Sequence, residues 1–337
     1  MQSRAYRAAM LVSLLVATGC SPVSSGGGAQ GAGDGTQGGG GAQGGGAQGT
    51  GGGGGAQGGG GAAAGTTFFT EDFEDADFSA RGWYDGDVGV ITDAEHQSGS
   101  HSLACHWLPG QAVPGVEGNW TFRHEFPDSD RVYVSAWWKF SAGWVGSGTT
   151  FHPHLFLILT NQNDDWAGPA FTRLTAYVET VFGYPRLALQ DGQNIDQARV
   201  GTDLVGVTEN RSTQGCNGIG DRYTDSVSCY QNGSEYWNGR EWDAPGTDLA
   251  DGGWHHVEAY FQLNTVANGV GVADGVLAYW VDGAKVVDAR DVLMRTGQLP
   301  DMKFNQFMLA PYIQPGDGSP ADQTLWIDDL VVGDARP

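Results

Sequence analysis

Residues 132–140 read Val-Tyr-Val-Ser-Ala-Trp-Trp-Lys-Phe, and this stretch decides the fold class. A run rich in β-branched and aromatic side chains predicts a strand. Similar runs follow, separated by turn signals such as Asp274-Gly275 and Asp282-Gly283. The other predicted strands cover 155–160, 174–181, 186–190, 255–263, 276–281 and 325–332. Since no window of about a dozen residues keeps a helical period, we expect an all-β sandwich or barrel.

Composition divides the 337-residue chain into parts. Most of the densest glycine sequence lies between Ser25 and Gly65, in repeats such as Gly-Ala-Gln-Gly. Such a segment buries too little apolar surface to offset its ordering entropy, so residues 21–66 are expected to form a disordered Gly/Ala/Gln-rich tether. The remainder, 67–337, has the length of one large all-β domain and can bury a core without disulfides.

The first 20 residues predict a secretion signal. Arg4 and Arg7 precede an apolar run over 10–16 that is too short to span a bilayer. The run ends in Ala17-Thr18-Gly19-Cys20, which resembles the lipobox of bacterial lipoproteins. This resemblance implies lipid attachment at Cys20, and Ser21 in place of Asp implies sorting to an outer membrane or the cell surface. The alternative is an ordinary cleaved signal with an incidental cysteine.

The chain is strongly acidic, with a formal net charge of −22. A negative surface repels phosphate backbones and anionic lipid head groups. We therefore expect no nucleic-acid partner, and contact with a membrane only through the lipid anchor. The same charge disfavours a polyanionic substrate unless one cleft is locally basic.

The segment from about 191 to 253 interrupts the strand pattern. It is rich in Gly, Asp and Asn, with interspersed tyrosines and tryptophans, and is predicted to be an ordered loop insertion. Cys216 and Cys229 are close in sequence, and an oxidising compartment predicts a disulfide between them. Cys105 alternates with Leu103 and Trp107 and is expected to be a buried thiol rather than a reactive one.

Several motifs together resemble one superfamily. They are the opening Phe69-Thr70-Glu71-Asp72-Phe73-Glu74, Gly82-Trp83, Ser98-Gly99-Ser100-His101-Ser102-Leu103, the segments 251–258 and 274–283, and the closing Trp326-Ile327-Asp328-Asp329-Leu330-Val331-Val332. This pattern resembles the concanavalin A-like lectin/glucanase superfamily, particularly its laminin-G-like and polysaccharide-lyase-like members. The resemblance implies a two-sheet antiparallel jelly roll with a sugar site on its concave sheet. Lectins, hydrolases, lyases and adhesion modules share this fold, so it is only weakly specific for function.

Strand alternation nominates residues for the sugar-binding face. On 255–263 the apolar set belongs in the core, so the polar set is expected to face the cleft, and the other strands are treated alike. The alternative is that these side chains are solvated outer-face residues. The predicted substrate-binding residues are Trp137, Lys139, Arg186, His256, Glu258 and Gln262.

A polysaccharide lyase needs a base, an acid and a group that neutralises a uronate carboxylate. His152 and His154 are expected to share a strand face with Phe156 and Ile158. The alternative for both histidines is a structural, hydrogen-bonded imidazole. The alginate-lyase signatures Gln-Ile-His and a Tyr-x-Lys-rich strand are absent from the sequence. The candidate catalytic residues are His152, His154, Arg173, Tyr177, Gln190 and Tyr260.

The carboxylates of the sequence bear on two further chemistries. The glucanase pattern close to Glu-x-Asp-x-x-Glu does not occur on a plausible central strand, which disfavours retaining glycoside hydrolysis. In jelly rolls that this chain resembles, an opening acid and an aspartate of the last strand bind a structural calcium. Glu74 with Asp328 or Asp329 is the expected pair, and surface carboxylates are the alternative.

Three functions remain open from the sequence. The first is a surface-anchored carbohydrate-binding or polysaccharide-acting module, expected to be a monomer with a polysaccharide or surface glycan as partner. The second is a lyase that cleaves a uronate polymer by β-elimination. The third is a non-catalytic adhesion or structural module. A convergent His–Tyr–Arg/Gln cluster in one cleft favours the lyase, exposed stacked aromatics favour binding, and an apolar or filled face favours adhesion.

Overall fold

The computed structural model describes residues 65–85, 89–114, 122–150, 153–161, 174–191, 222–223, 227–232, 235–297, 299–313 and 318–337. The predicted signal, lipidation site and tether therefore lie outside the described residues, apart from the last two tether positions. So do His152, Arg173 and Cys216, and the predicted disulfide stays a prediction. Within the described part, no helix is both long enough and apolar enough to cross a membrane.

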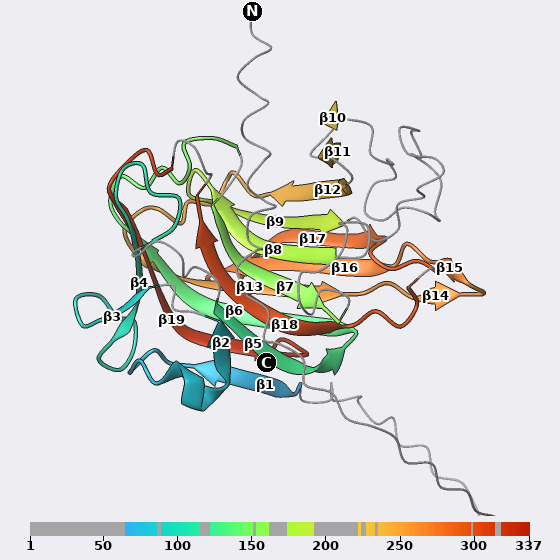
Figure 1. Ribbon diagram of the computed structural model, residues 1–337, viewed down its shortest axis with the longest axis horizontal. Coiled ribbons are helices and arrows are strands. Elements are labelled where there is room, and N and C mark those ends of the chain that lie inside the picture. The colour runs from blue at the N-terminus through green and yellow to red at the C-terminus, as the bar shows by residue number, and fades with distance from the viewer. Residues whose placement is uncertain are drawn as a thin grey trace, which may run out of the picture. The chain divides into compact units, whose positions relative to one another are not determined.

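Two large antiparallel sheets make up the domain (Figure 1). The eight-stranded sheet runs in the order β17 (Ala284–Val292), β16 (Gly275–Val281), β13 (Trp254–Gln262), β6 (Arg131–Phe140), β19 (Gln323–Gly333), β4 (Ser102–Trp107) and β3 (Val90–Thr92), and β1 (Thr67–Glu71) also pairs with β19. The nine-stranded sheet runs β10 (Arg222–Tyr223), β11 (Val227–Asn232), β12 (Glu235–Asp243), β9 (Tyr184–Asp191), β8 (Leu174–Val181), β7 (His154–Thr160), β18 (Phe304–Tyr312), β5 (Phe122–Ser129) and β2 (Trp83–Asp85). A short hairpin, β14 (Val266–Ala267) with β15 (Val270–Gly271), and a 3-10 turn at Phe78–Arg81 complete the described elements.

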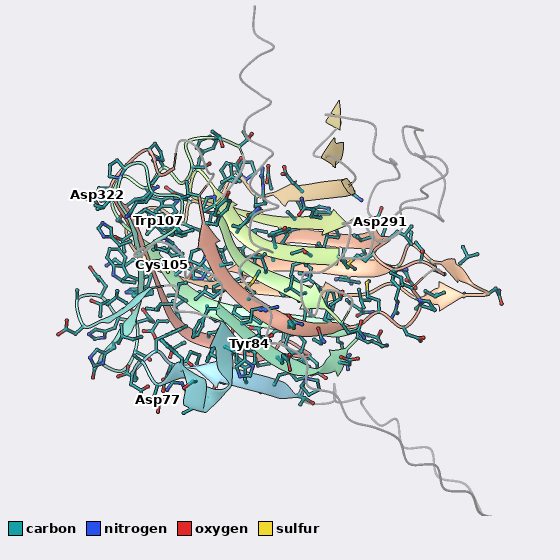
Figure 2. The ribbon with its side chains drawn as sticks, viewed as in Figure 1. Asp77, Tyr84, Cys105, Trp107, Asp291 and Asp322 are labelled. Atoms are coloured by element: carbon teal, nitrogen blue, oxygen red, sulfur yellow. The ribbon has the colours of Figure 1, made fainter. Side chains whose placement is uncertain are left out.

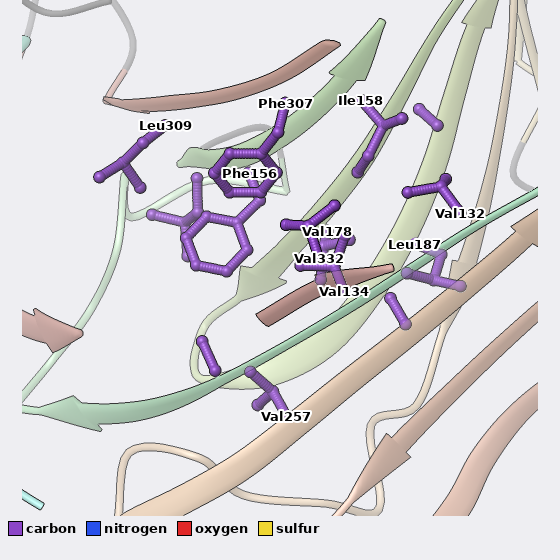
Figure 3. Close-up of a cluster of buried hydrophobic side chains, with 14 of the residues drawn as sticks. Val132, Val134, Phe156, Ile158, Val178, Leu187, Val257, Phe307, Leu309 and Val332 are labelled. Carbon is purple, nitrogen blue, oxygen red and sulfur yellow. The ribbon is translucent and has the colours of Figure 1, made fainter. Parts of the chain in front are cut away.

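The core lies between the two sheets and follows from strand alternation. On β6 every second side chain is buried in it, from Val132 to Phe140, and β13 contributes Val257, Ala259 and Phe261. From the nine-stranded sheet, the core contains Phe156, Ile158, Val178, Leu187 and Phe307 (Figure 3). The all-β antiparallel sandwich predicted from the sequence is therefore confirmed.

All seven strands named from the sequence are present, each within two residues of its expected ends. The segment 191–253 differs, because part of the expected loop is strand. β12 pairs with β9 from Asn238↔Asp191 to Asp243↔Arg186, and β11 pairs with β12. These strands extend the edge of the sheet through backbone hydrogen bonds, which a Gly- and Asn-rich sequence supports without an apolar alternation.

Cys105 and Trp107 lie on the buried side of β4 (Figure 2). Both side chains are 0% exposed, and Cys105 is outside any disulfide. Burial raises the pKa of the Cys105 thiol well above its usual value. The expectation of a buried, unreactive thiol is confirmed, since the thiolate is the reactive species.

Candidate functional site

The residues nominated from the sequence divide between the two outer faces of the sandwich. His154, Tyr177 and Gln190 belong to strands of the nine-stranded sheet, whereas Tyr260 belongs to the eight-stranded one. The predicted substrate-binding residues Trp137, Lys139, His256, Glu258 and Gln262 also lie on the eight-stranded sheet, on β6 and β13. Alternation identifies which residues share a face of one strand, but not which sheet the strand joins. The expectation of a single cleft containing them all was therefore wrong.

His154 also lies on a different face from the one expected. Leu155 and Phe156 are both part of the core, so the alternation of β7 breaks between them. The pairing of β7 with β18 shifts register at this point, between Leu309 and Tyr312. A register irregularity of this kind re-aims a side chain. His154 is turned away from Phe156 and Ile158 and packs instead against Tyr177.

His154, Tyr177 and Glu179 form the centre of a polar cluster on the nine-stranded sheet. The rings of His154 and Tyr177 are stacked, with their centroids 4.4 Å apart and an angle of 27° between the ring planes. The His154 Nδ1 lies 2.8 Å from Oε2 of Glu179, whose side chain is 5% exposed. Tyr312 of β18 lies beyond, with its ring 6.3 Å from His154. The three adjacent strands β18, β7 and β8 thus bring one group of titratable side chains together.

Gln190 joins this cluster through Tyr177. The Tyr177 hydroxyl donates to Oε1 of Gln190 over 2.9 Å. The two residues come from β8 and β9, where Thr175↔Gln190 and Tyr177↔Ala188 are paired, so they are diagonal neighbours on one face. Accepting this bond fixes the Gln190 amide, whose NH₂ group is the donor of the side chain.

Arg186 lies beside the cluster on β9, directly opposite Glu179 of β8. It is 3% exposed, and its guanidinium donates to both carboxylate oxygens of Asp243 at 2.6 and 3.0 Å and to the Thr150 carbonyl at 2.7 Å. Glu241 Oε1 lies 3.2 Å from Nη1. A guanidinium held in this way is a fixed charge next to Glu179 on this face. Its predicted direct contact with substrate stays a prediction.

Burial shifts the proton equilibria of the cluster. It lowers the pKa of His154 to about 3, with the Arg186 charge acting in the same direction. It raises the pKa of Glu179 to about 8 against the opposing effect of Arg186, and that of Glu241 to about 7. Near neutral pH the imidazole is therefore uncharged and Glu179 largely protonated. This face carries less negative charge than its carboxylates suggest.

Sequence reasoning placed Glu179 on the strand face of Tyr177 but gave it no catalytic role, and it assigned no role to Glu241, Asp243 or Tyr312. A signal existed for Glu179, which is the one charged residue in the otherwise uncharged strand 174–181. A carboxylate at such a position requires partners when the strand is central. No signal in the sequence places β12, with Glu241 and Asp243, beside β9.

The carboxylates predicted to bind calcium hold one loop. Glu74 Oε1 accepts the backbone N–H groups of Ser100 at 2.8 Å and His101 at 3.2 Å. Asp328 Oδ2 accepts those of Gln97 at 2.8 Å and Ser98 at 3.1 Å, and Asp329 accepts from the Ser98 hydroxyl. Among the described residues no group of three His, Cys, Asp or Glu side chains is placed to hold a metal ion. In this arrangement the carboxylates fit N–H donors rather than a cation, and calcium stays a prediction.

The chain matches no protein-family model and no curated protein sequence. Solved structures are similar to it. The marine alginate lyase from Aplysia kurodai superposes with a TM-score of 0.51 at 12% identity, covering 81% of this chain and 100% of the enzyme. The alginate lyase from Chlorella virus gives 0.46 at 13% identity, over 74% of this chain and 92% of the enzyme. The endo-β-1,4-glucuronan lyase from the fungus Trichoderma reesei gives 0.45 at 15% identity, over 80% and 96%. At such identities the similarity to the Aplysia enzyme shows the fold alone, a two-sheet antiparallel jelly-roll sandwich.

Proposed function

We propose that this protein is a polysaccharide lyase that cleaves a uronate polymer by β-elimination on the outer face of its nine-stranded sheet. The observation that carries the proposal is the convergence of His154, Tyr177 and Gln190, with Glu179 behind His154. These are the residue types that the reaction needs, and they come from three adjacent strands. The similar alginate and glucuronan lyases agree in fold.

The chemistry assigns one role to each group. The His154 imidazole takes the proton from C5 of the uronate, and those electrons form the C4–C5 double bond. The bond from C4 to the glycosidic oxygen breaks, and the Tyr177 hydroxyl gives that oxygen a proton. Gln190 donates its amide N–H to the uronate carboxylate, which lowers the cost of charge developing beside C5. No water is consumed, and the product end carries an unsaturated uronate.

Ultraviolet absorbance of the unsaturated product tests the proposal. The purified protein is incubated with alginate, glucuronan, polygalacturonate and a neutral glucan. We expect absorbance to grow with at least one uronate polymer and not with the neutral glucan. Absence of growth with every uronate polymer, together with retention on one of them, would support the non-catalytic binding module instead.

The pH dependence of the reaction follows from Glu179. When protonated, its carboxyl donates to His154 Nδ1, so the single proton of the neutral imidazole is on Nε2. When Glu179 ionises, Nδ1–H donates to the carboxylate, and Nε2 gains the lone pair that a base requires. With the pKa of Glu179 at about 8, we expect kcat/KM to rise about tenfold per pH unit below that value and then level off. His154 itself, with its pKa at about 3, does not titrate in this range.

Glu179→Gln is the matched variant for this pH dependence. An amide does not titrate, so the rise through about pH 8 should disappear. The same substitution should also reduce the pH dependence of the free energy of unfolding. Folding raises the Glu179 pKa from 4.5, so its contribution is complete at low pH and is lost as pH rises through about 8. If kcat/KM of the Glu179→Gln variant still rises toward alkaline pH, Glu179 does not take part in the mechanism.

We further propose that the enzyme is a monomer held at an outer membrane or cell surface by lipid on Cys20, with 21–66 as tether. The lipobox-like Ala17-Thr18-Gly19-Cys20 supports this. We expect Cys20→Ala to move the protein from the detergent phase to the aqueous phase in detergent phase partition. Ser21→Ala is the control and should stay in the detergent phase. Equal partition of Cys20→Ala and the unsubstituted protein would indicate an ordinary cleaved signal.

A further inference from the structure

The outer face of the eight-stranded sheet carries a groove of about 350 Å³. Its lining comes from β13, β16, β17 and the C-terminal residues, and consists of Tyr260, Gln262, Val276, Ala278, Trp280 and Arg290 with Ala335 and Arg336. This volume lies within the range of ligand-binding pockets, though near its lower end. The core separates the groove from His154, so no single sugar unit can occupy both places.

The strand register explains why the face is hollow here. Tyr260 pairs with Ala278 and Gln262 pairs with Val276, so large polar or aromatic side chains stand directly across from small apolar ones. Trp280 continues the row on β16, opposite Glu258. Two aromatic rings and an amide therefore border a low apolar strip. This combination of apolar contact and few polar groups is typical of ligand pockets.

A buried carboxylate fixes one wall of the groove. Glu258 is 4% exposed and receives a bidentate bond from Arg336, with Nε to Oε1 at 2.8 Å and Nη2 to Oε2 at 2.9 Å. The Tyr133 hydroxyl donates to the same carboxylate at 2.8 Å. Arg336 in turn places its Cζ 4.9 Å from the Trp280 ring centroid. The tryptophan is thus held in place before any ligand arrives, which lowers the entropy cost of binding.

Four cationic side chains lie around this groove in an otherwise acidic chain. Arg290 and Arg336 line it, Lys285 Nζ lies 5.4 Å from the Trp280 ring, and Arg131 interacts with Tyr260. The carboxylates that pair with these four cations are Glu258, Asp288 and Asp334. The exposed Asp291 next to Arg290 adds a fourth carboxylate, so the surroundings of the groove are close to neutral, whereas the whole chain carries −22. An anionic ligand is therefore repelled less here than by the acidic surface as a whole.

We propose that this groove is a second, non-catalytic binding site for an anionic polysaccharide chain. The rings of Trp280 and Tyr260 cover the apolar faces of the sugars, Gln262 bonds their hydroxyls, and Arg290 bonds their carboxylates. The site keeps the protein on a polymer independently of the chemistry at His154. It rests on the groove's own geometry and stands whether or not the opposite face is catalytic.

Affinity electrophoresis in native gels containing alginate, with dextran gels as the neutral reference, tests this site. We expect Trp280→Ala to weaken retardation by alginate roughly tenfold and Arg290→Ala to weaken it severalfold. Arg240→Ala is the matched control, because it also removes an arginine placed over a tryptophan ring, at 4.8 Å from Trp242. It should migrate as the unsubstituted protein does.

The outcomes separate this proposal from the lyase. Trp280→Ala and Arg290→Ala should cleave short uronate oligosaccharides at the unchanged rate, whereas His154→Ala should be retarded normally. Thermal melts verify that each variant is folded. If the groove variants lose retardation and the unsubstituted protein cleaves no uronate polymer, the groove proposal is supported and the lyase proposal is contradicted. Normal retardation of both groove variants, or equal retardation by dextran, would overturn the groove proposal.

Discussion

His154→Ala should lower kcat for a uronate polymer by roughly 10²–10⁴-fold, the range that a positioned general base contributes. The imidazole is kept neutral by burial and oriented by Glu179 at 2.8 Å, so its truncation removes the base of the proposed mechanism. KM should change less, because the carboxylate and hydroxyl contacts of the substrate do not depend on this ring. Initial rates of absorbance growth over a range of substrate concentrations measure both parameters.

His106→Ala is the control for this substitution. His106 also faces a carboxylate, with Nε2 at 2.8 Å from Asp322, but it lies on β4 of the other sheet with its side chain 49% exposed. Its removal should leave kcat unchanged. His154→Gln keeps a polar side chain if the alanine variant does not fold. Retention of full activity by either His154 variant would return the residue to a structural role.

Glu71→Ala should destabilise the fold by about 3 kcal/mol, the lower end of the range for removing one partner of a buried ion pair. Glu71 is 1% exposed and is the common acceptor for the Phe73 N–H at 3.1 Å, Arg81 Nε at 2.8 Å and Trp83 Nε1 at 2.8 Å. Its loss leaves the two buried donors without their acceptor, in addition to breaking the ion pair. Denaturant unfolding followed by tryptophan fluorescence measures the change.

Asp75→Ala provides the comparison. Asp75 binds the same guanidinium, with Oδ1 at 2.6 Å from Arg81 Nη1, but its side chain is 65% exposed. Exposed pairs contribute about 0–1 kcal/mol because solvent screens them. We therefore expect a shift in the free energy of unfolding several times smaller than that of Glu71→Ala. Equal shifts would mean that the burial of Glu71 does not decide its contribution.

The two proposed sites lie on opposite faces of the sandwich and differ in the state of their charged groups. Burial suppresses charge in the proposed catalytic cluster, since near neutral pH Glu179 largely holds its proton and Glu241, with its pKa at about 7, is only partly ionised. The proposed retention groove depends on residues that keep their charges near the surface. A polymer can contact both faces only through separate segments of its chain. In this proposal, the groove keeps a long substrate close to the proposed catalytic face.

Local sequence was sufficient for the strands and for much of the core. The alternation of Val132, Val134 and Ala136 with Tyr133 and Ser135 assigns β6 its inner and outer faces without further information. The same reasoning placed Val257 and Phe261 correctly in the core. It also placed Tyr177 with Glu179 and Gln190 with Arg186 on their respective strand faces, because these pairs depend only on a period of two.

The composition of the site depended on the tertiary structure. Alternation is a property of one strand, whereas the sheet order β13-β6-β19 on one side and β9-β8-β7-β18 on the other is set by pairings between distant segments. For that reason Tyr260 was grouped with Tyr177 although the core lies between them. The register shift opposite Leu155 is likewise invisible in the sequence, and it alone brings His154 to Glu179. Local residue patterns therefore specify an all-β chain and the inner and outer face of each strand. Only the packing of the two sheets decided which outer faces meet, because that choice is made by long-range pairing and core contacts.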